Sequence, residues 1–595
     1  MYLQYELLPT NNPANFAFYS QQIKLSNMHF SFRLLTLLLV LVFSTFLSAQ
    51  PQVPKNWFHL DPSKDGYNGV ASDRAHSELL KGRPARQIVV AILDSGVDAE
   101  HEDLKSVMWV NPGEIPGNGI DDDKNGYIDD IHGWNFIGGK NGNVGPDSYE
   151  TTRLYAQMRY KYEDADPDKL TRKQKKEFAQ YLKLKNEVEG RRSSASSNLE
   201  GMLASQNQVL SAIDAVVQSL GDKPLNPENL DAIGDNDSKK LSLGVTIAKN
   251  IISQDPSIAS AQALKDFVLN EYKEGTQHFK KELEYNFNPD FDSRKIVGDN
   301  YNDVNERYYG NNDVEGPEAS HGTHVAGLVA AARNNGLGMD GVADQVRIMS
   351  VRCVPDGDER DKDVANAIRY AVDNGASVIN MSFGKGHSPN KEAVDEAVRY
   401  AASKDVLLVH AAGNSGANID EVENFPNRYY KKKKLFSSNK AKNWLEIGAL
   451  SAEQGTNMLA GFSNYGKKNV DLFSPGMVIY STVPDSKYQN LQGTSMASPI
   501  AAGVAAMIRS YFPTLTAVQV KEILRNSVVK TDIMVKVPGK SAGQKKLSDL
   551  SSTGGFINAY NAVLLASKTK GKKKVKDWKD LGPIVPGSPL KDIKP

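Results

Sequence analysis

The stretch 493–499 (GTSMASP), with the run of small apolar residues that follows it to Ile508, constrains the fold more than any other segment. Small side chains let a helix pack closely against its neighbours, and proline is tolerated in the first turn of a helix. We therefore expect a helix that begins at or just after Ser495. The free N–H groups and helix dipole at that point favour negative charge, so Ser495 is a candidate nucleophile if a base and an orienting acid lie nearby.

Two other stretches supply candidate partners for this serine. Residues 88–93 are wholly apolar and predict a buried parallel strand. The strand ends at Asp94, where open α/β folds place their ligand crevice. His321 begins a second helix that is rich in small residues (HGTHVAG). Serine, histidine and aspartate together are the side chains of a nucleophilic triad, in which the histidine takes the serine proton and the aspartate orients the histidine.

Predicted strands and helices alternate through the second half of the chain. Apolar runs predict strands, and amphipathic segments predict helices between them. This alternation indicates a parallel sheet with helices on both faces. The predicted strands are 347–354, 377–384, 406–411, 444–450 and 470–473, and the predicted helices are 363–373 and 391–403.

Segments 88–104 and 320–530 resemble the subtilisin-like serine peptidases, the subtilase family, whose Asp, His and Ser motifs follow one another in this order. The resemblance implies a three-layer α/β fold with a central, mainly parallel sheet. It also implies a triad of Asp94, His321 and Ser495. The Asn414 amide and the Ser495 backbone N–H would bind the oxyanion, and catalysis would need no cofactor.

The resemblance also implies two walls of a substrate groove. One strand would pair with an extended peptide through backbone hydrogen bonds, a mode that tolerates many side chains. Small residues would form the other wall of the pocket for the residue before the cut, which favours a broad or apolar-leaning specificity for protein and peptide substrates. The first wall is Ser382, Phe383 and Gly384, and the second is Ala411, Ala412 and Gly413.

Other functions are also compatible with some of these residues. A serine at a helix start is often only a cap. His321 and His324, one helical turn apart, also suit a metal-dependent hydrolase that uses acids such as Asp94 or Glu318, but that leaves Asn414 without a role. A non-catalytic binding module is a third alternative, which the loss of a triad residue would favour, and none is lost.

Residues 118–130 (NGIDDDKNGYIDD) form an acidic turn that follows the first nine positions of an EF-hand-like calcium loop. His132 stands where such a loop has its closing glutamate, and Asp130 is the alternative closing carboxylate. The sequence leaves open both a structural calcium and a solvated acidic turn. The predicted calcium ligands are Asp121, Asp123, Asn125, Tyr127 and Asp129.

A long segment between Asp94 and His321, residues 146–290, does not resemble the family core. Leu203, Leu210, Ile213, Val217 and Leu220 recur at helical spacing within it. We interpret the segment as a helical insertion, a hairpin or small bundle that packs on the core or on itself. A lid, a propeptide substitute with an autoinhibitory role, or a partner-binding arm is the alternative.

The insertion divides the predicted catalytic domain into residues 50–145 and 291–565, and a basic tail, 566–595, follows. Residues 34–47 are apolar but shorter than the roughly 20 residues that cross a bilayer. With a small-residue cleavage site before Gln50, they predict a signal peptide over residues 28–49, with residues 1–27 an upstream artefact.

We therefore expect a secreted or periplasmic protein with no stable membrane span. The short segment between Gln50 and Asp94 leaves little room for the folded propeptide that many members of the family carry. Basic and acidic residues both number 71, and this balance argues against a nucleic-acid-binding protein. The single cysteine, Cys353, excludes an intrachain disulfide.

Overall fold

The computed structural model describes residues 53–233, 238–433, 438–540, 543–578 and 581–586. The chain divides after Pro54, and the second unit is Lys55–Pro595. The predicted signal peptide lies outside the described residues. Within the described ranges, no helix has both the length and the apolar character that crossing a membrane requires.

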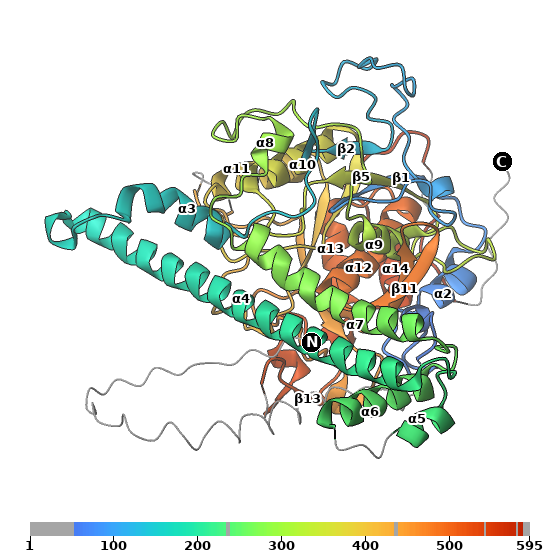
Figure 1. The fold of residues 1–595 in the computed structure, drawn as a ribbon. Helices are drawn as coiled ribbons and strands as arrows, with labels where there is room; N and C mark the ends of the chain where they lie inside the picture. The colour runs from blue at the N-terminus through green and yellow to red at the C-terminus, as the bar shows by residue number, and fades with distance from the viewer. Residues whose placement is uncertain (1–52, 234–237, 434–437, 541–542, 579–580, 587–595) are drawn as a thin grey trace. The chain divides into compact units, whose positions relative to one another are not determined.

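A nine-stranded sheet forms the centre of the unit Lys55–Pro595, in the order β12-β15-β9-β8-β7-β6-β1-β5-β2 (Figure 1). Its strand pairs are parallel except for β12 with β15. The strands are β1 (Ile88–Asp94), β2 (Gly133–Asn135), β5 (Val346–Arg352), β6 (Ala376–Met381), β7 (Leu407–Ala411), β8 (Trp444–Leu450), β9 (Leu472–Pro475), β12 (Val529–Lys530) and β15 (Gly555–Phe556).

Helices cover both faces of this sheet, because the side chains of a strand alternate between the faces. Ala91 and Leu93 of β1 share a hydrophobic cluster with α10 (Asp361–Asp373) and α11 (Lys391–Ser403). The other face packs against α9 (Ser320–Ala330) and α12 (Thr494–Tyr511), which lie next to each other. Two further helices, α13 (Ala517–Asn526) and α14 (Ala559–Lys568), follow α12. The predicted three-layer α/β fold is confirmed.

Six strands that form three antiparallel pairs were not predicted. The antiparallel pair of β10 (Ile479–Val483) and β11 (Lys487–Leu491) lies against α9. Strand β11 (KYQNL) is polar and largely exposed, so its sequence carries no apolar alternation that would indicate a strand. The remaining short pairs are β3 (Gly138–Gly139) with β4 (Gly142–Asn143), and β13 (Met534–Lys536) with β14 (Gln544–Lys546).

The insertion is helical and has a hydrophobic core of its own. Helix α4 packs along α6 and α7, and Ile213 and Leu220 of α4 are buried between them, whereas Leu203 of the predicted seam is 37% exposed. A Thr171–Gln174 capping box begins α4. The helices of the insertion are α3 (Glu150–Tyr162), α4 (Arg172–Leu220), α5 (Pro227–Ile233), α6 (Lys239–Gln254) and α7 (Ala261–Lys281), and α8 (Arg294–Val297) follows the insertion.

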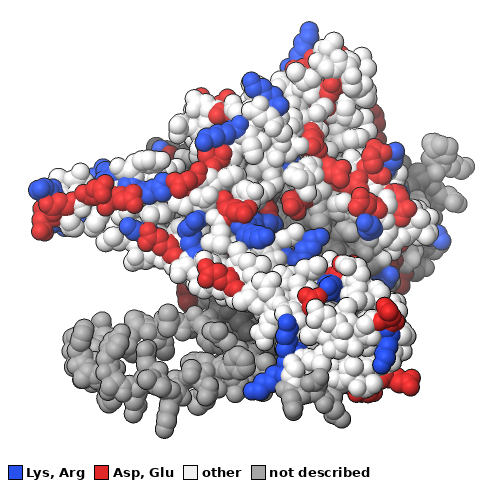
Figure 2. All heavy atoms as spheres, in the orientation of Figure 1, with Lys and Arg blue, Asp and Glu red and all other residues white. Residues whose placement is uncertain are grey.

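Acidic and basic side chains are interspersed on the face of the molecule shown in Figure 2, including along the projecting part of α4. Several of them form ion pairs within the insertion, such as Lys161 with Glu177 at 2.6 Å. This mixture of signs on one face agrees with the zero formal charge of the whole chain.

Candidate active site

Asp94 and His321 meet at the carboxyl end of β1. The Nδ1 atom of His321 donates a hydrogen bond of 2.6 Å to Oδ1 of Asp94, which also accepts the Ser95 backbone N–H at 2.8 Å. Asp94 is buried, whereas the His321 side chain is 39% exposed. Helix α9 approaches this closely because residue 322 is glycine: a Cβ there would lie 2.1 Å from the Gly96 carbonyl oxygen.

Asp94 also changes the basicity of the imidazole. Burial by itself lowers the pKa of His321, but the charge of Asp94 and its hydrogen bond together outweigh burial, so the pKa lies above its ordinary value of 6.5. A carboxylate in contact with Nδ1 favours the protonated ring and fixes the neutral tautomer that leaves Nε2 free to accept a proton.

Ser495 is the second residue of α12, and Gly493 with a φ of 154° precedes the helix. The prediction that Pro499 lies in the first turn is wrong, because Pro499 is inside the helix. A proline has no N–H to donate to the carbonyl four residues earlier, which here is that of Ser495. The hydroxyl of Ser382 donates to that carbonyl instead, at 2.9 Å.

A second hydrogen bond between the same two residues runs in the opposite direction. The Ser495 hydroxyl donates to the Ser382 carbonyl oxygen at 3.1 Å. Ser382 is in turn held by Asn380 of β6, whose Nδ2 donates to the Ser382 hydroxyl at 2.9 Å. The side chain of Ser495 is thus fixed against the strand that was predicted to bind substrate.

Asn414 lies just after β7 and faces the start of α12. The backbone N–H and the hydroxyl of Thr494 donate to its Oδ1, at 2.8 and 2.9 Å. The two ends of an amide diverge, so this contact directs Nδ2 away from Thr494. Asn414 and Ser495 both line the same groove.

A groove of about 520 Å³ brings most of the predicted site residues together. Ala412 does not line the groove: it is fully buried, and its carbonyl accepts Nδ2 of Asn464 at 2.8 Å. Asn424 and Asn464 line the groove but were not predicted, because each is a lone amide in a loop without a motif. The predicted residues that line it are Asp94, His321, Ser382, Phe383, Gly384, Ala411, Gly413, Asn414 and Ser495.

His324 has a different role from His321. It is fully buried, and its Nε2 lies 3.0 Å from the Ile479 carbonyl and 3.2 Å from that of Gln489, both in the β10–β11 hairpin. Burial first, and then the charge of His321, lower the pKa of His324 to about 3. His324 is therefore a neutral residue that joins α9 to the hairpin, and this use weighs against a metal site built on the two histidines.

The acidic turn gathers three carboxylates, and only one of them is among the five predicted ligands. Oxygens of Glu114, Asp123 and Asp130 all lie within 4.8 Å of one another. Asp130 is the alternative closing carboxylate named above; burial raises its pKa to about 6 against the hydrogen bonds of Tyr370, Asn111 and Asn125. Glu114 was missed because it precedes the turn and belongs to no motif.

The other predicted ligands have local partners in the structure. Asp121 accepts the backbone N–H groups of Asn125 and Gly126, and Asp129 accepts those of Gly117 and Gly119, all at 2.8 to 3.0 Å. Tyr127 is buried against the ring of Trp134. Asp121 and Asp129 therefore shape the turn and lie outside the group of three carboxylates. Asn125 lies against that group, because its Nδ2 donates to Asp123 and to Asp130, at 3.1 Å in both cases.

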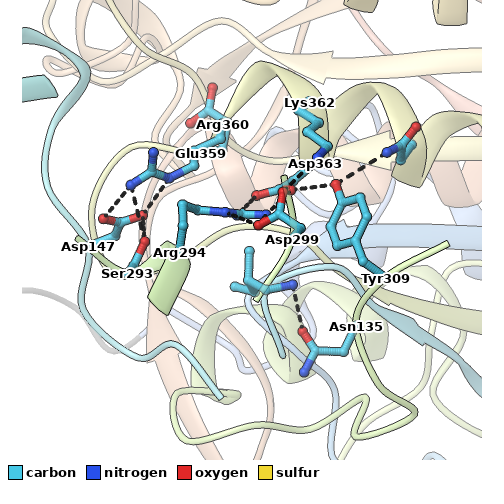
Figure 3. Close-up of polar contacts among 12 residues, drawn as sticks. Asn135, Asp147, Ser293, Arg294, Asp299, Tyr309, Glu359, Arg360, Lys362 and Asp363 are labelled. Atoms are coloured by element: carbon cyan, nitrogen blue, oxygen red, sulfur yellow. Dashed lines mark hydrogen bonds and ion pairs between the residues drawn. The ribbon is translucent and has the colours of Figure 1, made fainter. Parts of the chain in front are cut away.

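A buried ionic network joins both ends of the insertion to the start of α10 (Figure 3). Asp147 accepts hydrogen bonds from Arg360 at 3.0 Å and from Ser293 at 2.8 Å. Arg294 pairs with Asp363 at 2.8 Å and with Asp299 at 2.6 Å. Lys362 also pairs with Asp299, at 2.6 Å, and the hydroxyl of Tyr309 donates to Asp363 at 2.7 Å.

This network lies directly after one wall of the groove. We define the groove wall as residues 354–359. Residues 354–357 and Glu359 line the groove. The insertion also braces the groove wall from the other side: Lys281, the last residue of α7, pairs with Asp356, and Asn286 donates to the Asp356 carbonyl at 3.1 Å. The wall is therefore held between the insertion and α10.

An imidazole that is polarised by a buried acid, and that shares a groove with an alcohol and an amide donor, suits acyl transfer through a serine nucleophile. The α/β fold and this arrangement of side chains are typical of serine hydrolases. The comparison with known sequences gives the family: the chain belongs to the subtilase family, whose model matches residues 85–554.

Three relatives show how far the similarity extends. The chain is 34% identical over 277 residues to "Thermophilic serine proteinase" of Bacillus sp. (strain AK1). The aligned residues cover 46% of this chain and 58% of that protein. The chain is 38% identical over 209 residues to Subtilisin BL of Lederbergia lenta, covering 35% and 69%, and 36% identical over 244 residues to Thermitase of Thermoactinomyces vulgaris, covering 41% and 74%. Family and relatives indicate the serine-type endopeptidase class.

Proposed function

We propose that the protein is an exported serine endopeptidase that hydrolyses peptide bonds through Asp94, His321 and Ser495. The observation that carries the proposal is the 2.6 Å contact between His321 and Asp94, in a groove that Ser495 also lines. The subtilase match supports it independently.

The chemistry follows from this geometry. The Ser495 hydroxyl oxygen attacks the carbonyl carbon of the substrate while Nε2 of His321 takes the hydroxyl proton. The same proton then passes to the leaving amine as the C–N bond breaks, which leaves an acyl-enzyme. A water molecule, deprotonated by His321, releases the acid and restores Ser495. Asp94 stabilises the imidazolium in both halves of the reaction.

The tetrahedral intermediate carries a negative oxygen that needs donors. Asn414 Nδ2 and the backbone N–H of Ser495 at the start of α12 are the proposed donors, because Thr494 occupies the other end of the Asn414 amide. Loss of one such donor lowers kcat by a factor of about 10²–10³, a magnitude measured on subtilisin itself.

Substrate would lie as an extended strand beside Ser382, Phe383 and Gly384, with its main chain hydrogen-bonded to this segment. Ala411 and Gly413 leave room for the side chain before the cut, which favours a broad or apolar-leaning preference at that position. The predicted signal peptide supports export, to the periplasm or out of the cell.

A fluorophosphonate probe tests the triad, because its phosphorus forms a bond with an activated serine oxygen and fluoride leaves. We expect one equivalent of label on Ser495 in the presence of EDTA. The labelling rate falls as the pH drops through the His321 pKa, which Asp94 raises above 6.5, because a protonated ring cannot take the serine proton. Intact-mass spectrometry at pH values from about 5 to 9 measures both the number of labels per protein and the labelling rate.

Three outcomes separate the alternatives. A rate that is flat between about pH 5 and 8 contradicts the role of His321 as base. Labelling that disappears with chelation points to a metal-dependent hydrolase. A folded protein that takes no label at any pH is a non-catalytic module.

We also propose a structural calcium at the acidic turn. Carboxylate oxygens are the ligands that calcium prefers, and three of them converge within 4.8 Å at Glu114, Asp123 and Asp130. Like charges this close repel one another, and a divalent cation would neutralise them. The ion would have no part in the chemistry at Ser495.

We expect replacement of calcium by EGTA to lower the thermal unfolding temperature by several degrees, because a ligand at about 100 times its Kd stabilises the folded state by about 2.7 kcal/mol. Calorimetry on the Ser495→Ala protein avoids self-digestion during the scan. Asp123→Asn should abolish the difference between calcium and EGTA. Asp122→Asn, which removes a neighbouring acid outside the cluster, should keep it; equal unfolding temperatures in calcium and EGTA would remove the proposal.

A further inference from the structure

The substrate groove is acidic beyond its catalytic aspartate. Glu318, Asp356 and Glu359 line it together with Asp94, and no lysine or arginine is among the described residues that do so. Asp356 and Glu359 belong to the groove wall, whereas Ala411 ends β7 and Gly413 follows it. The acids and the small-residue pocket come from different segments of the chain, so we expect them to face different residues of a bound peptide.

Two of these acids show what the wall can bind. Asp356 pairs with the ammonium group of Lys281, which the end of α7 brings to the groove rim. The negative charge of Glu318 acts on the same ammonium group and, like that of Asp356, raises the Lys281 pKa against the effect of burial. The rim of the groove thus already holds one primary ammonium group from the chain itself.

Glu359 is the acid that lacks such a partner. It is 2% exposed, and its Oε1 is buried without a hydrogen bond although the residue lines the groove. In Figure 3 its carboxylate points away from the Arg360–Asp147 pair. A buried carboxylate oxygen without a donor is rare in folded proteins, since it loses its hydration and gains nothing in return.

The cations close to Glu359 are already engaged. Lys385 donates to the Glu150 carboxylate at 2.8 Å, pairs with Asp361 at 2.9 Å, and reaches only the backbone carbonyl of Glu359, at 2.7 Å. Arg153 likewise reaches that carbonyl, at 3.3 Å. The surrounding charge therefore orders the Glu359 backbone and leaves its carboxylate for something that enters the groove.

The electrostatics agree with an acid that is incomplete without a ligand. Burial raises the pKa of Glu359 to about 8; the charge of Lys385 opposes this rise and that of Asp358 adds to it. A cation placed against this carboxylate would favour its ionised form and lower its pKa again.

We propose that Glu359 forms, with the rim acids Asp356 and Glu318, a subsite that binds the ammonium or guanidinium group of a lysine or arginine in the peptide substrate. The basic residue lies on the amino side of the cut, beyond the position held by the small-residue pocket. This inference rests on the proposed peptidase function and adds the chemical class of residue that the groove selects.

Paired peptides test the subsite on the unmodified enzyme. Each pair carries lysine or its uncharged isostere norleucine at one of the four positions before the cut, and kcat/KM is measured at about pH 9, where Glu359 is ionised. We expect a preference for lysine of about 10- to 100-fold at one position other than the one next to the cut, as a charge-assisted hydrogen bond supplies. Equal kcat/KM values at all four positions would overturn the proposal.

Glu359→Gln assigns the preference to this side chain, because it removes the charge and keeps the shape. We expect the lysine-to-norleucine ratio to fall to near one in Glu359→Gln, and to stay at the parent value in Glu187→Gln, which removes an exposed acid from α4. A ratio that Glu359→Gln leaves unchanged contradicts the assignment. Fluorophosphonate titration counts active sites in each variant, so an enzyme that takes label but shows no preference fails this inference alone, whereas a folded protein that takes no label fails the proposed function.

Discussion

Ser495→Ala is expected to lower kcat for peptide hydrolysis by a factor on the order of 10⁶, a magnitude measured for the catalytic serine of subtilisin itself. The substitution removes the only atom that forms the covalent bond with the substrate, while the carbonyl of residue 495 can still accept the Ser382 hydroxyl. We therefore expect the fold and the affinity for peptides to be preserved. Steady-state kinetics on a peptide substrate, with circular dichroism to confirm folding, measures the effect.

Two comparisons sharpen this result. Ser510→Ala removes a buried hydroxyl from the same helix, bonded only to the Met507 carbonyl, and should retain parent activity. Ser495→Ala combined with His321→Ala should be no slower than Ser495→Ala alone, because the two side chains act as one unit. Peptide cleavage that Ser495→Ala leaves undiminished, in a preparation free of other peptidases, would refute the assignment.

Asp363→Asn is expected to be the most destabilising single substitution in the buried ionic network that joins the insertion to α10. Asp363 is fully buried, and both Arg294 and Tyr309 donate to it. Its neutral replacement leaves the buried Arg294 guanidinium with one carboxylate in place of two. Breaking a buried ion pair in this way costs about 3–5 kcal/mol. Differential scanning calorimetry, again in the Ser495→Ala protein, should show a fall of more than about 5 °C in the unfolding temperature.

A surface pair provides the matched control for this prediction. Asp290→Asn removes the same charge from the ion pair between Arg159 and Asp290, in which the Asp290 side chain is 70% exposed. Exposed pairs contribute about 0–1 kcal/mol, so the unfolding temperature should change little. Equal shifts for Asp363→Asn and Asp290→Asn would show that the buried network does not anchor the insertion.

The parts of the site that depend on patterns among neighbouring residues could be predicted from the sequence. A wholly apolar strand such as β1 can only be buried on both faces, so the position of Asp94 at its end follows directly. Helix α11 and strand β8 have the predicted bounds, because α11 has a regular amphipathic pattern and β8 is apolar apart from Glu446 and Gly448. The segment that carries Ser495 is helical as expected. The helix starts at Thr494, so Pro499 lies inside the helix and not in its first turn.

Features that depend on distant contacts were not accessible in this way. Glu114 joins Asp123 and Asp130 only through the folding of the whole turn. The unpartnered state of Glu359 depends on Lys385 being held by Glu150, a residue at the start of the insertion. No pattern in the neighbouring residues reports such an arrangement, because it is set by three segments that meet only in the folded chain.

The contact between Ser293 and Asp147 has a further consequence for how this enzyme can vary. The chain leaves the catalytic domain and returns to it at points whose side chains lie 2.8 Å apart. The insertion therefore begins and ends at neighbouring points, as segments inserted into a domain commonly do. An enzyme without the insertion could keep the sheet, but Asp356 would lose its ion pair with Lys281, and Lys385 would lose its ion pair with Glu150.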